Sequence, residues 1–145
     1  MVKVLIKKLD PSVQIPEYKT SGASGMDLMA FVNKPIVLPP KSSCLVPTGL
    51  SVAFSNEYEI QIRPRSGLAV KNNISVLNTP GTIDSDYRGE IKIILFNHGN
   101  NDFVIKDKDR IAQMILVPVA KMNLEEKENL PNTIRGESGF GSTGK

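Results

Sequence analysis

Short segments in which apolar and polar residues alternate occur along most of the chain. Val2–Leu9 and Tyr58–Arg63 follow this two-residue period, which is typical of a strand with one buried face. Further strands are predicted at Cys44–Phe54, Phe103–Ile105 and Ile111–Val119, and shorter apolar segments lie at Met26–Ala30 and Ile36–Leu38. Within Cys44–Phe54, Pro47 and Gly49 indicate a bulge or an edge strand.

Helical periodicity is weak in this sequence. Only Lys121–Leu130 carries many helix-forming residues, and its apolar positions do not follow a helical period. Many short strands separated by Gly and Pro therefore predict an all-β protein, either a sandwich or a barrel. No internal repeat is present.

The stretch Asn78–Ile91 organises the chain. Apolar runs enter and leave it, and Pro80-Gly81 and Gly89 mark its turns, so the sequence predicts a strand, a loop and a strand. Ile83 is the large aliphatic residue between these glycines and is expected to anchor the loop to a core. Two carboxylates, one aromatic ring and one guanidinium then lie at the mouth of a pocket. The alternative is an ordinary turn whose Asp residues bind local backbone donors.

Composition limits the classes of partner. The chain has 145 residues, enough for one domain, with 40% apolar residues, 23% charged residues and a net charge of +3. No long run of Lys and Arg is present, so neither nucleic acid nor a membrane surface is expected as a partner. No apolar stretch is long enough to span a membrane. A small anionic ligand remains compatible with the charge.

A single cysteine and a single histidine limit the chemistry. Cys44 excludes an intrachain disulfide and favours a reducing, cytoplasmic location. His98 lies in a turn-like segment, where we expect a surface residue, and a Cys/His zinc site or a Ser-His-Asp triad is implausible. A general base must then be a carboxylate, a Lys or a Tyr.

The C-terminal segment has an unusual composition for a flexible tail. We expect residues 1–131 to form the core domain and residues 132–145 to form a mobile tail. Its glycines and hydroxyl groups can wrap an anion, Arg135 suits a phosphate, and Phe140 can stack on a base. The alternative is a disordered linker.

Three further segments are weaker candidates. Pro64-Arg65-Ser66-Gly67 combines a guanidinium with a hydroxyl beside glycine, although a plain β-turn explains it equally well. Arg110 and Gln113 are expected on opposite faces of a strand. As alternatives to ligand binding, Arg110 could form a structural salt bridge and the amide of Gln113 could be solvated. Asp27 follows a loop of small residues and could be a turn carboxylate. Neither a P-loop nor a dinucleotide fingerprint is present.

Taken together, five collinear segments resemble the five motifs of the trimeric dUTPases (deoxyuridine triphosphate nucleotidohydrolases). They are Ala23–Leu28, Pro64–Ala69, Gly81–Glu90, Arg110–Met114 and Arg135–Gly144. The resemblance runs from near residue 20 to the C-terminus, and the five segments in this order are highly specific. Ser138 departs from the pattern, because the family usually has glycine there.

The resemblance implies a jelly-roll-like β fold and a homotrimer whose active sites are shared between chains. It implies Mg²⁺-dependent hydrolysis of dUTP to dUMP and pyrophosphate, which limits uracil incorporation into DNA and supplies dUMP for dTTP synthesis. Asp84 would be the general base, and Asp27 would hold the metal through water. The substrate-binding residues it implies are Arg65, Ser66, Gly67, Asn78, Thr82, Ile83, Tyr87, Lys92, Gln113, Arg135, Phe140, Ser142 and Thr143.

These implied roles divide the substrate into parts. Arg65, Ser66 and Gly67, with Gln113, would bind the α- and β-phosphates. Asn78 and main-chain groups near Thr82, Ile83 and Lys92 would read uracil, and Tyr87 would pack under the deoxyribose. Phe140 would cover the base, while the other tail residues would grip the γ-phosphate. Two alternatives stay open: a dCTP deaminase of the same superfamily, and a non-catalytic jelly-roll protein that binds nucleotide for regulation.

Overall fold

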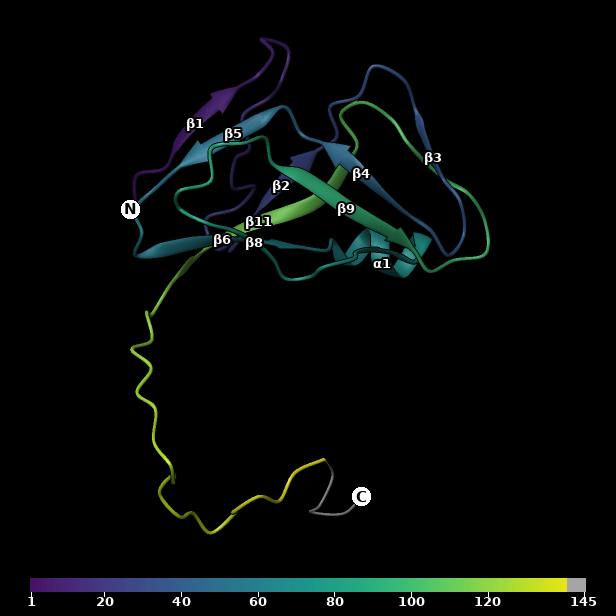
Figure 1. Ribbon diagram of the computed structural model, residues 1–145. Helices are drawn as coiled ribbons and strands as arrows, with labels where there is room; N and C mark the ends of the chain where they lie inside the picture. The colour runs from purple at the N-terminus through teal and green to yellow at the C-terminus, as the bar shows by residue number, and fades with distance from the viewer. Residues whose placement is uncertain (141–145) are drawn as a thin grey trace.

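The computed structural model describes residues 1–140, and within them the chain forms eleven strands and one short helix (Figure 1). The elements are β1 (Leu5–Lys8), β2 (Met26–Met29), β3 (Ile36–Leu38), β4 (Ser43–Pro47), β5 (Leu50–Ala53), β6 (Tyr58–Arg63), α1 (Ser66–Asn72), β7 (Ile74–Val76), β8 (Gly81–Ile83), β9 (Lys92–Asn97), β10 (Phe103–Ile105) and β11 (Arg110–Pro118). The predicted all-β class is confirmed, and the arrangement is a sandwich.

Two larger sheets form the centre of this sandwich. One has the strand order β2-β11-β6-β8 and the other has the order β4-β9-β7, while β1 pairs with β5 and β3 pairs with β10. All of these pairs are antiparallel. β9 also contacts β11, so the two larger sheets meet around a shared core.

Alternation along the strands explains which side chains fill this core. In β9 the side chains of Ile93, Leu95 and Asn97 are buried, and those of the intervening residues are more accessible. Asn97 is tolerated there because its amide nitrogen donates to the carbonyls of Leu38 and Asn101, at 3.0 and 2.8 Å. Apart from Asn97, Thr48 and Ser51, the core side chains are aliphatic, with β-branched residues prominent, as suits a pleated surface.

The sequence-based prediction differs from the structure at two elements. Cys44–Phe54 is not one strand, because Thr48 and Gly49 separate β4 from β5 and the two strands enter different sheets. After Pro64, where a plain β-turn was the alternative interpretation of Pro64–Gly67, the chain forms helix α1 (Ser66–Asn72). The helix has 7 residues, about two turns, which is too short for a helical apolar period to be recognised in the sequence. Lys121–Leu130, despite its helix formers, is irregular.

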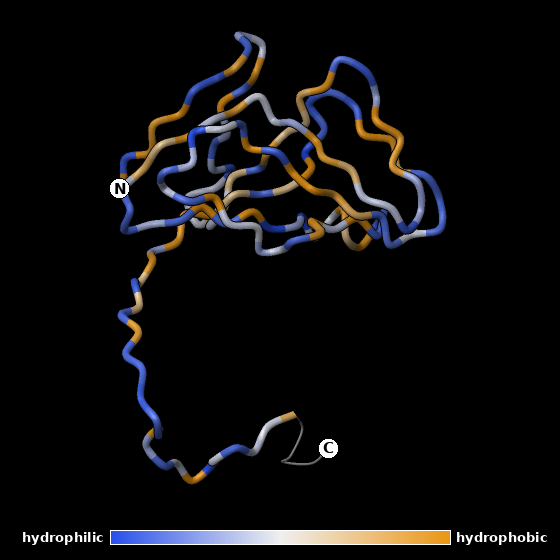
Figure 2. Tube along the Cα trace, viewed as in Figure 1, coloured by the Kyte–Doolittle hydropathy of each residue, from blue (hydrophilic) through white to orange (hydrophobic). Residues whose placement is uncertain are grey.

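Beyond β11 the chain leaves the sandwich. The backbone N–H of Val119 still donates to the carbonyl of Glu57 at 2.8 Å, whereas residues 120–138 are exposed and run away from the sheets (Figure 1). Figure 2 shows that this segment is mostly hydrophilic with isolated apolar residues. The domain boundary at residue 131 stays a prediction. In residues 1–140, the helix is too short to cross a membrane.

Gly49 gives a test of the corner between β4 and β5. Its φ is +68°, and an added Cβ would lie 2.5 Å from Cγ2 of Val13 and 3.1 Å from the ring of Phe31. We expect Gly49→Ala to lower the free energy of unfolding by about 1–3 kcal/mol, because it adds both backbone strain and overpacking. Urea denaturation measures this change. Gly22→Ala is the control, since no described atom lies within 4 Å of its added Cβ.

An effect of Gly49→Ala no larger than that of Gly22→Ala would show that the corner can rearrange. In that case the β4–β5 corner would not be a fixed support for the segments that bind to it.

Candidate active site

A carboxylate between two guanidinium groups forms the first group of candidate residues. Nε of Arg65 donates to Oδ1 of Asp27 at 2.7 Å, and Nη1 of Arg110 lies 3.3 Å from Oδ2 of the same carboxylate. The side chain of Asp27 is 20% exposed and that of Arg65 is 24% exposed. Gln113 lies opposite Asp27 in the strand register and donates from Nε2 to the carbonyl of Pro64 at 2.9 Å. We call Asp27, Arg65, Arg110 and Gln113 the arginine cluster.

A β-bulge brings Arg110 and Gln113 to the same side of β11. The register to β2 shifts between Arg110 and Ala112, so that Arg110 faces Met29 and Gln113 faces Asp27. An extra residue inverts the alternation locally, and both side chains then reach the neighbourhood of Asp27. The prediction that they occupy opposite faces is therefore wrong. The salt bridge expected as the alternative for Arg110 is present, and Gln113 is half-buried and not merely solvated.

Ser66 and Gly67 follow Arg65 directly at the start of α1. Both are exposed, and within residues 1–140 no side chain caps the helix. The backbone at Arg65 is extended, with φ −94° and ψ 127°, so the chain changes direction between the guanidinium and the helix. An anion next to Arg65 can therefore also reach the Ser66 hydroxyl and backbone N–H groups of the first turn.

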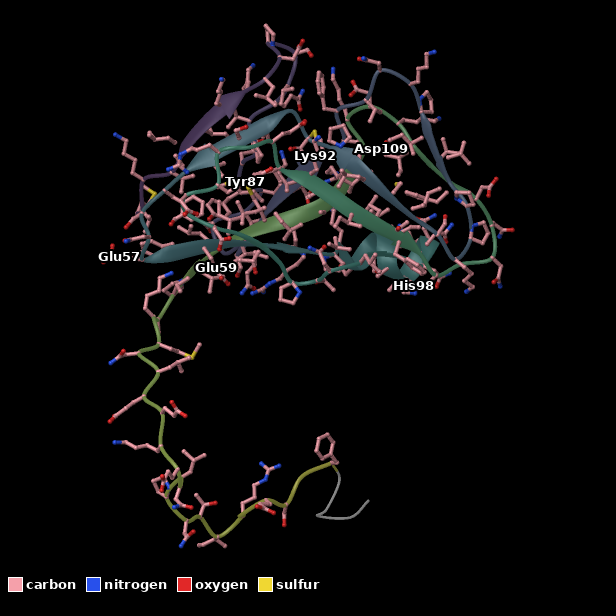
Figure 3. The ribbon with its side chains drawn as sticks, viewed as in Figure 1. Glu57, Glu59, Tyr87, Lys92, His98 and Asp109 are labelled. Atoms are coloured by element: carbon pink, nitrogen blue, oxygen red, sulfur yellow. The ribbon has the colours of Figure 1, made fainter. Side chains whose placement is uncertain are left out.

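The loop after β8 forms the second group. Here a cavity of about 370 Å³ is lined by Leu45, Thr82, Ile83, Asp84, Tyr87, Glu90 and Lys92. Asp84 is exposed at this cavity, where a ligand can reach its carboxylate. Ile83 packs against the core, which confirms the predicted anchor. Figure 3 shows Tyr87 and Lys92 near the start of β9, with His98 near its opposite end.

Local contacts fix the shape of this loop. The backbone N–H of Tyr87 donates to the carbonyl of Asp84 at 3.1 Å, and the phenol of Tyr87 donates to the carbonyl of Glu90 at 2.9 Å. The ring of Tyr87 covers Gly89 so closely that an added Cβ there would overlap it. Tyr87 is thus held at its backbone and at its hydroxyl, while 44% of the residue stays exposed.

The remaining predicted residues are less closely grouped. Asn78 is exposed and its amide lies over Gly81, where an added Cβ would be 3.2 Å from Nδ2. Arg135 and Phe140 are exposed on the C-terminal segment, and Arg135 donates from Nε to the carbonyl of Ser138 at 2.9 Å. Ser142 and Thr143 lie outside the described residues.

One chain therefore presents its candidate residues in separate groups. Among residues 1–140, the residues that line the cavity include no member of the arginine cluster, and strand β6 lies between β11 and β8. Thr82 and Gln113 nevertheless belong to the same sheet, opposite Gln61 and Arg63 of β6. Arg135 and Phe140, on the exposed C-terminal segment, form a third group. Figure 1 shows this segment leading away from the sheets.

Metal binding by protein ligands alone is not supported by this part of the chain. Within residues 1–140, no three His, Cys, Asp or Glu side chains lie together as a metal site. Asp27 supplies one carboxylate already bound to two guanidinium groups, although each of its oxygens can accept a further hydrogen bond. These residues fit an ion that is carried by a phosphate ligand and retains its waters, as Mg²⁺ does.

Sequence reasoning missed Glu90 as a residue of the cavity. Its only sequence signal is that it follows Gly89 at the end of the loop, which says nothing about where its side chain lies. His98 is exposed, as predicted, and its Nε2 lies 2.7 Å from the hydroxyl of Ser75.

Comparison with known proteins places this chain in a family. The dUTPase family model matches residues 11–144. A deoxyuridine 5′-triphosphate nucleotidohydrolase of Treponema denticola is 53% identical, with 94% of this chain and 95% of that protein covered. The protein of the same name from Fusobacterium nucleatum is 49% identical, with 100% of both chains covered. The chain belongs to the dUTPase family.

Solved structures share this fold. A single-residue variant of the Staphylococcus bacteriophage 80alpha dUTPase with dUpNHpp has a TM-score of 0.88 at 23% identity, with 99% of both chains covered. A variant of the dUTPase from phage phi11 of S. aureus, which coordinates a structural Mg(II) ion, has a TM-score of 0.80 at 19% identity, with 90% of this chain and 99% of that chain covered. At these identities the likeness concerns the fold.

Proposed function

We propose that this chain hydrolyses dUTP to dUMP and pyrophosphate. The observation that carries the proposal is Asp84, an exposed carboxylate held at the mouth of a cavity by a loop whose conformation is fixed. Asp84 accepts the proton that a water molecule loses as it attacks the α-phosphorus. The bond from that phosphorus to the bridging oxygen breaks, and pyrophosphate leaves. Membership of the dUTPase family supports this reaction.

The arginine cluster binds the phosphates in this proposal. Its two guanidinium groups and one carboxylate leave a formal charge of one positive, and Asp27 fixes the orientation of the Arg65 fork. Arg65, Ser66 and Gly67 hold the α- and β-phosphates together with Gln113. Preorganised donors at the phosphates stabilise charge that develops in the transition state.

The cavity beside Asp84 recognises the nucleoside. Asn78 and the main chain at Thr82, Ile83 and Lys92 read the polar edge of uracil. Tyr87 packs under the deoxyribose and excludes a 2′-hydroxyl by shape. Its phenol is fixed to the carbonyl of Glu90, so the ring is preorganised for this contact.

Mg²⁺ is the cofactor that we propose, bound to the triphosphate with Asp27 holding one of its waters. When bound, the ion neutralises phosphate charge and orients the triphosphate. We also propose a cytoplasmic location, where Cys44 stays reduced. In the cell, this activity limits uracil incorporation into DNA and supplies dUMP for dTTP synthesis.

A homotrimer completes the site in this proposal. One chain keeps the arginine cluster, the Asp84 cavity and the C-terminal residues in three separate groups, and three chains related by symmetry can bring one group of each kind together. The C-terminal segment supports assembly, because it exposes large apolar side chains that a neighbouring chain can cover. They are Met122, Leu124 and Leu130, which precede the tail.

Asp84→Asn tests the chemistry. The substitution keeps the size of the side chain and removes the base, so we expect kcat to fall by roughly 10²–10⁴-fold while dUTP still binds. Pyrophosphate release measures the rate. Asp86→Asn is the matched control from the same exposed loop and should stay within a few-fold of wild type. In a parallel assay with dCTP as the substrate, ammonia release would instead indicate a deaminase. Near-normal turnover by Asp84→Asn would remove this carboxylate from the mechanism.

Deletion of residues 132–145 tests the tail. Ordering these residues costs roughly 1–2 kcal/mol per residue, which Arg135 and Phe140 offset only when the triphosphate and the base are bound. We expect kcat/KM for dUTP to fall by orders of magnitude, while sedimentation still gives about three times the chain mass. Normal turnover by the truncated chain would show that the tail is a linker. An active monomer would contradict the shared site.

A further inference from the structure

Glu90 lies between the cavity and the corner that joins β4 to β5. Its side chain is 20% exposed, and Oε1 accepts the backbone N–H of Gly49 at 2.9 Å. Oε2 lies 3.7 Å from Nζ of Lys92, on the cavity side. One carboxylate thus contacts both the structural corner and the lining of the cavity.

The corner that Glu90 binds is itself closely fixed. Gly49 has φ +68° and no room for a side chain, and its carbonyl accepts the N–H of Leu9 at 2.8 Å. The next residue after Glu90 is bound to the same corner twice: the hydroxyl of Thr48 donates to the carbonyl of Ile91 at 2.6 Å, and the N–H of Ile91 donates to the carbonyl of Leu50 at 2.8 Å. Glu90 extends this attachment by one residue toward the loop.

The backbone of Glu90, in turn, holds the side chain of Tyr87. The phenol of Tyr87 donates to the backbone carbonyl of Glu90, and the backbone of Tyr87 closes a turn onto Asp84. A rotation of the Glu90 peptide therefore moves the hydroxyl of Tyr87 and, through the turn, the carboxylate of Asp84. The side chain of Glu90 opposes such a rotation because it anchors the residue to Gly49.

We propose that Glu90 is a positioning residue that fixes the loop carrying Asp84 and Tyr87 to the β4–β5 corner, and so sets both the rate of hydrolysis and the exclusion of ribose. The inference rests on the roles proposed above for Asp84 and Tyr87. A carboxylate suits the task because a charged acceptor binds a backbone N–H more strongly than a neutral one. Displacement of a reacting group by about 1 Å can cost about 10²-fold in rate.

Three substitutions at Glu90 separate positioning from general stability. Glu90→Ala removes the acceptor, and we expect kcat for dUTP to fall by about 10–100-fold and the ratio of kcat/KM for dUTP over UTP to fall by about 10-fold. Glu90→Gln keeps an acceptor for Gly49 and should recover most of both quantities. Glu90→Asp keeps the charge but is one methylene too short to reach Gly49, so it should behave like Glu90→Ala. If Glu90→Ala does not fold, Glu90→Asp takes its place in the experiment.

Two controls and one direct readout complete the experiment. Glu17→Ala removes a carboxylate from an exposed ion pair with Lys19, and Ile105→Val loosens the core at β10. Neither should change the ratio of dUTP to UTP. Amide hydrogen exchange at Gly49 should accelerate in Glu90→Ala and stay slow in Glu90→Gln. The backbone N–H of Gly49 loses its acceptor only in Glu90→Ala.

Two results overturn the inference while leaving the proposed function in place. One is a Glu90→Ala enzyme that keeps the wild-type kcat and the wild-type ratio. The other is an equal change of the ratio in Ile105→Val, which would reduce Glu90 to a general stabilising residue. Wild-type protein measured in parallel separates the two claims, since its failure to hydrolyse dUTP would overturn the proposed function itself.

Discussion

The segment from Leu77 to Ile91 crosses from one sheet to the other and back, and the placement of the candidate chemistry depends on this crossing. Strands β7 and β9 flank the segment and both lie in the three-stranded sheet, with β7 paired to β9. Between them, β8 pairs with β6 in the four-stranded sheet. Ile83 and Ile91 are the apolar anchors on either side of the intervening loop. Residues 84–90 form the loop between these two anchors.

The crossing explains how exposed polar groups can be fixed without being buried. Exposed loops usually retain conformational freedom, which a catalytic carboxylate cannot tolerate. Here the strand pairing of β8 fixes the start of the loop, and the hydrogen bonds of Glu90 and Ile91 to the β4–β5 corner fix its end. Tyr87 links the two ends of the loop, because its backbone N–H donates to the carbonyl of Asp84 and its phenol donates to the carbonyl of Glu90. The supporting contacts are therefore backbone bonds, the hydroxyl groups of Thr48 and Tyr87, and the half-buried carboxylate of Glu90.

Sequence reasoning predicted the elements that depend on local pattern. Tyr58–Arg63 and Ile36–Leu38 coincide with β6 and β3, because alternation and a proline stop are local signals. The bulge in β11 was missed, since it arises from the pairing with β2 and leaves no trace in composition. The crossing of β8 into the other sheet was missed for the same reason. The candidate site residues were predicted from their motifs, whereas the role proposed for Glu90 depends on a contact with Gly49, 41 positions away in the chain.

The central claim is that an active site draws Asp84 from one chain and the C-terminal tail from another. Mixing two inactive proteins tests it most directly: Asp84→Asn, which retains the tail, and a chain lacking residues 132–145, which retains Asp84. After subunit exchange at equal amounts, a shared site predicts that about a quarter of the sites combine both intact parts, so dUTP hydrolysis returns to about a quarter of the wild-type rate. If exchange is complete and no activity returns, each site takes Asp84 and the tail from the same chain, and the account of a shared site is wrong.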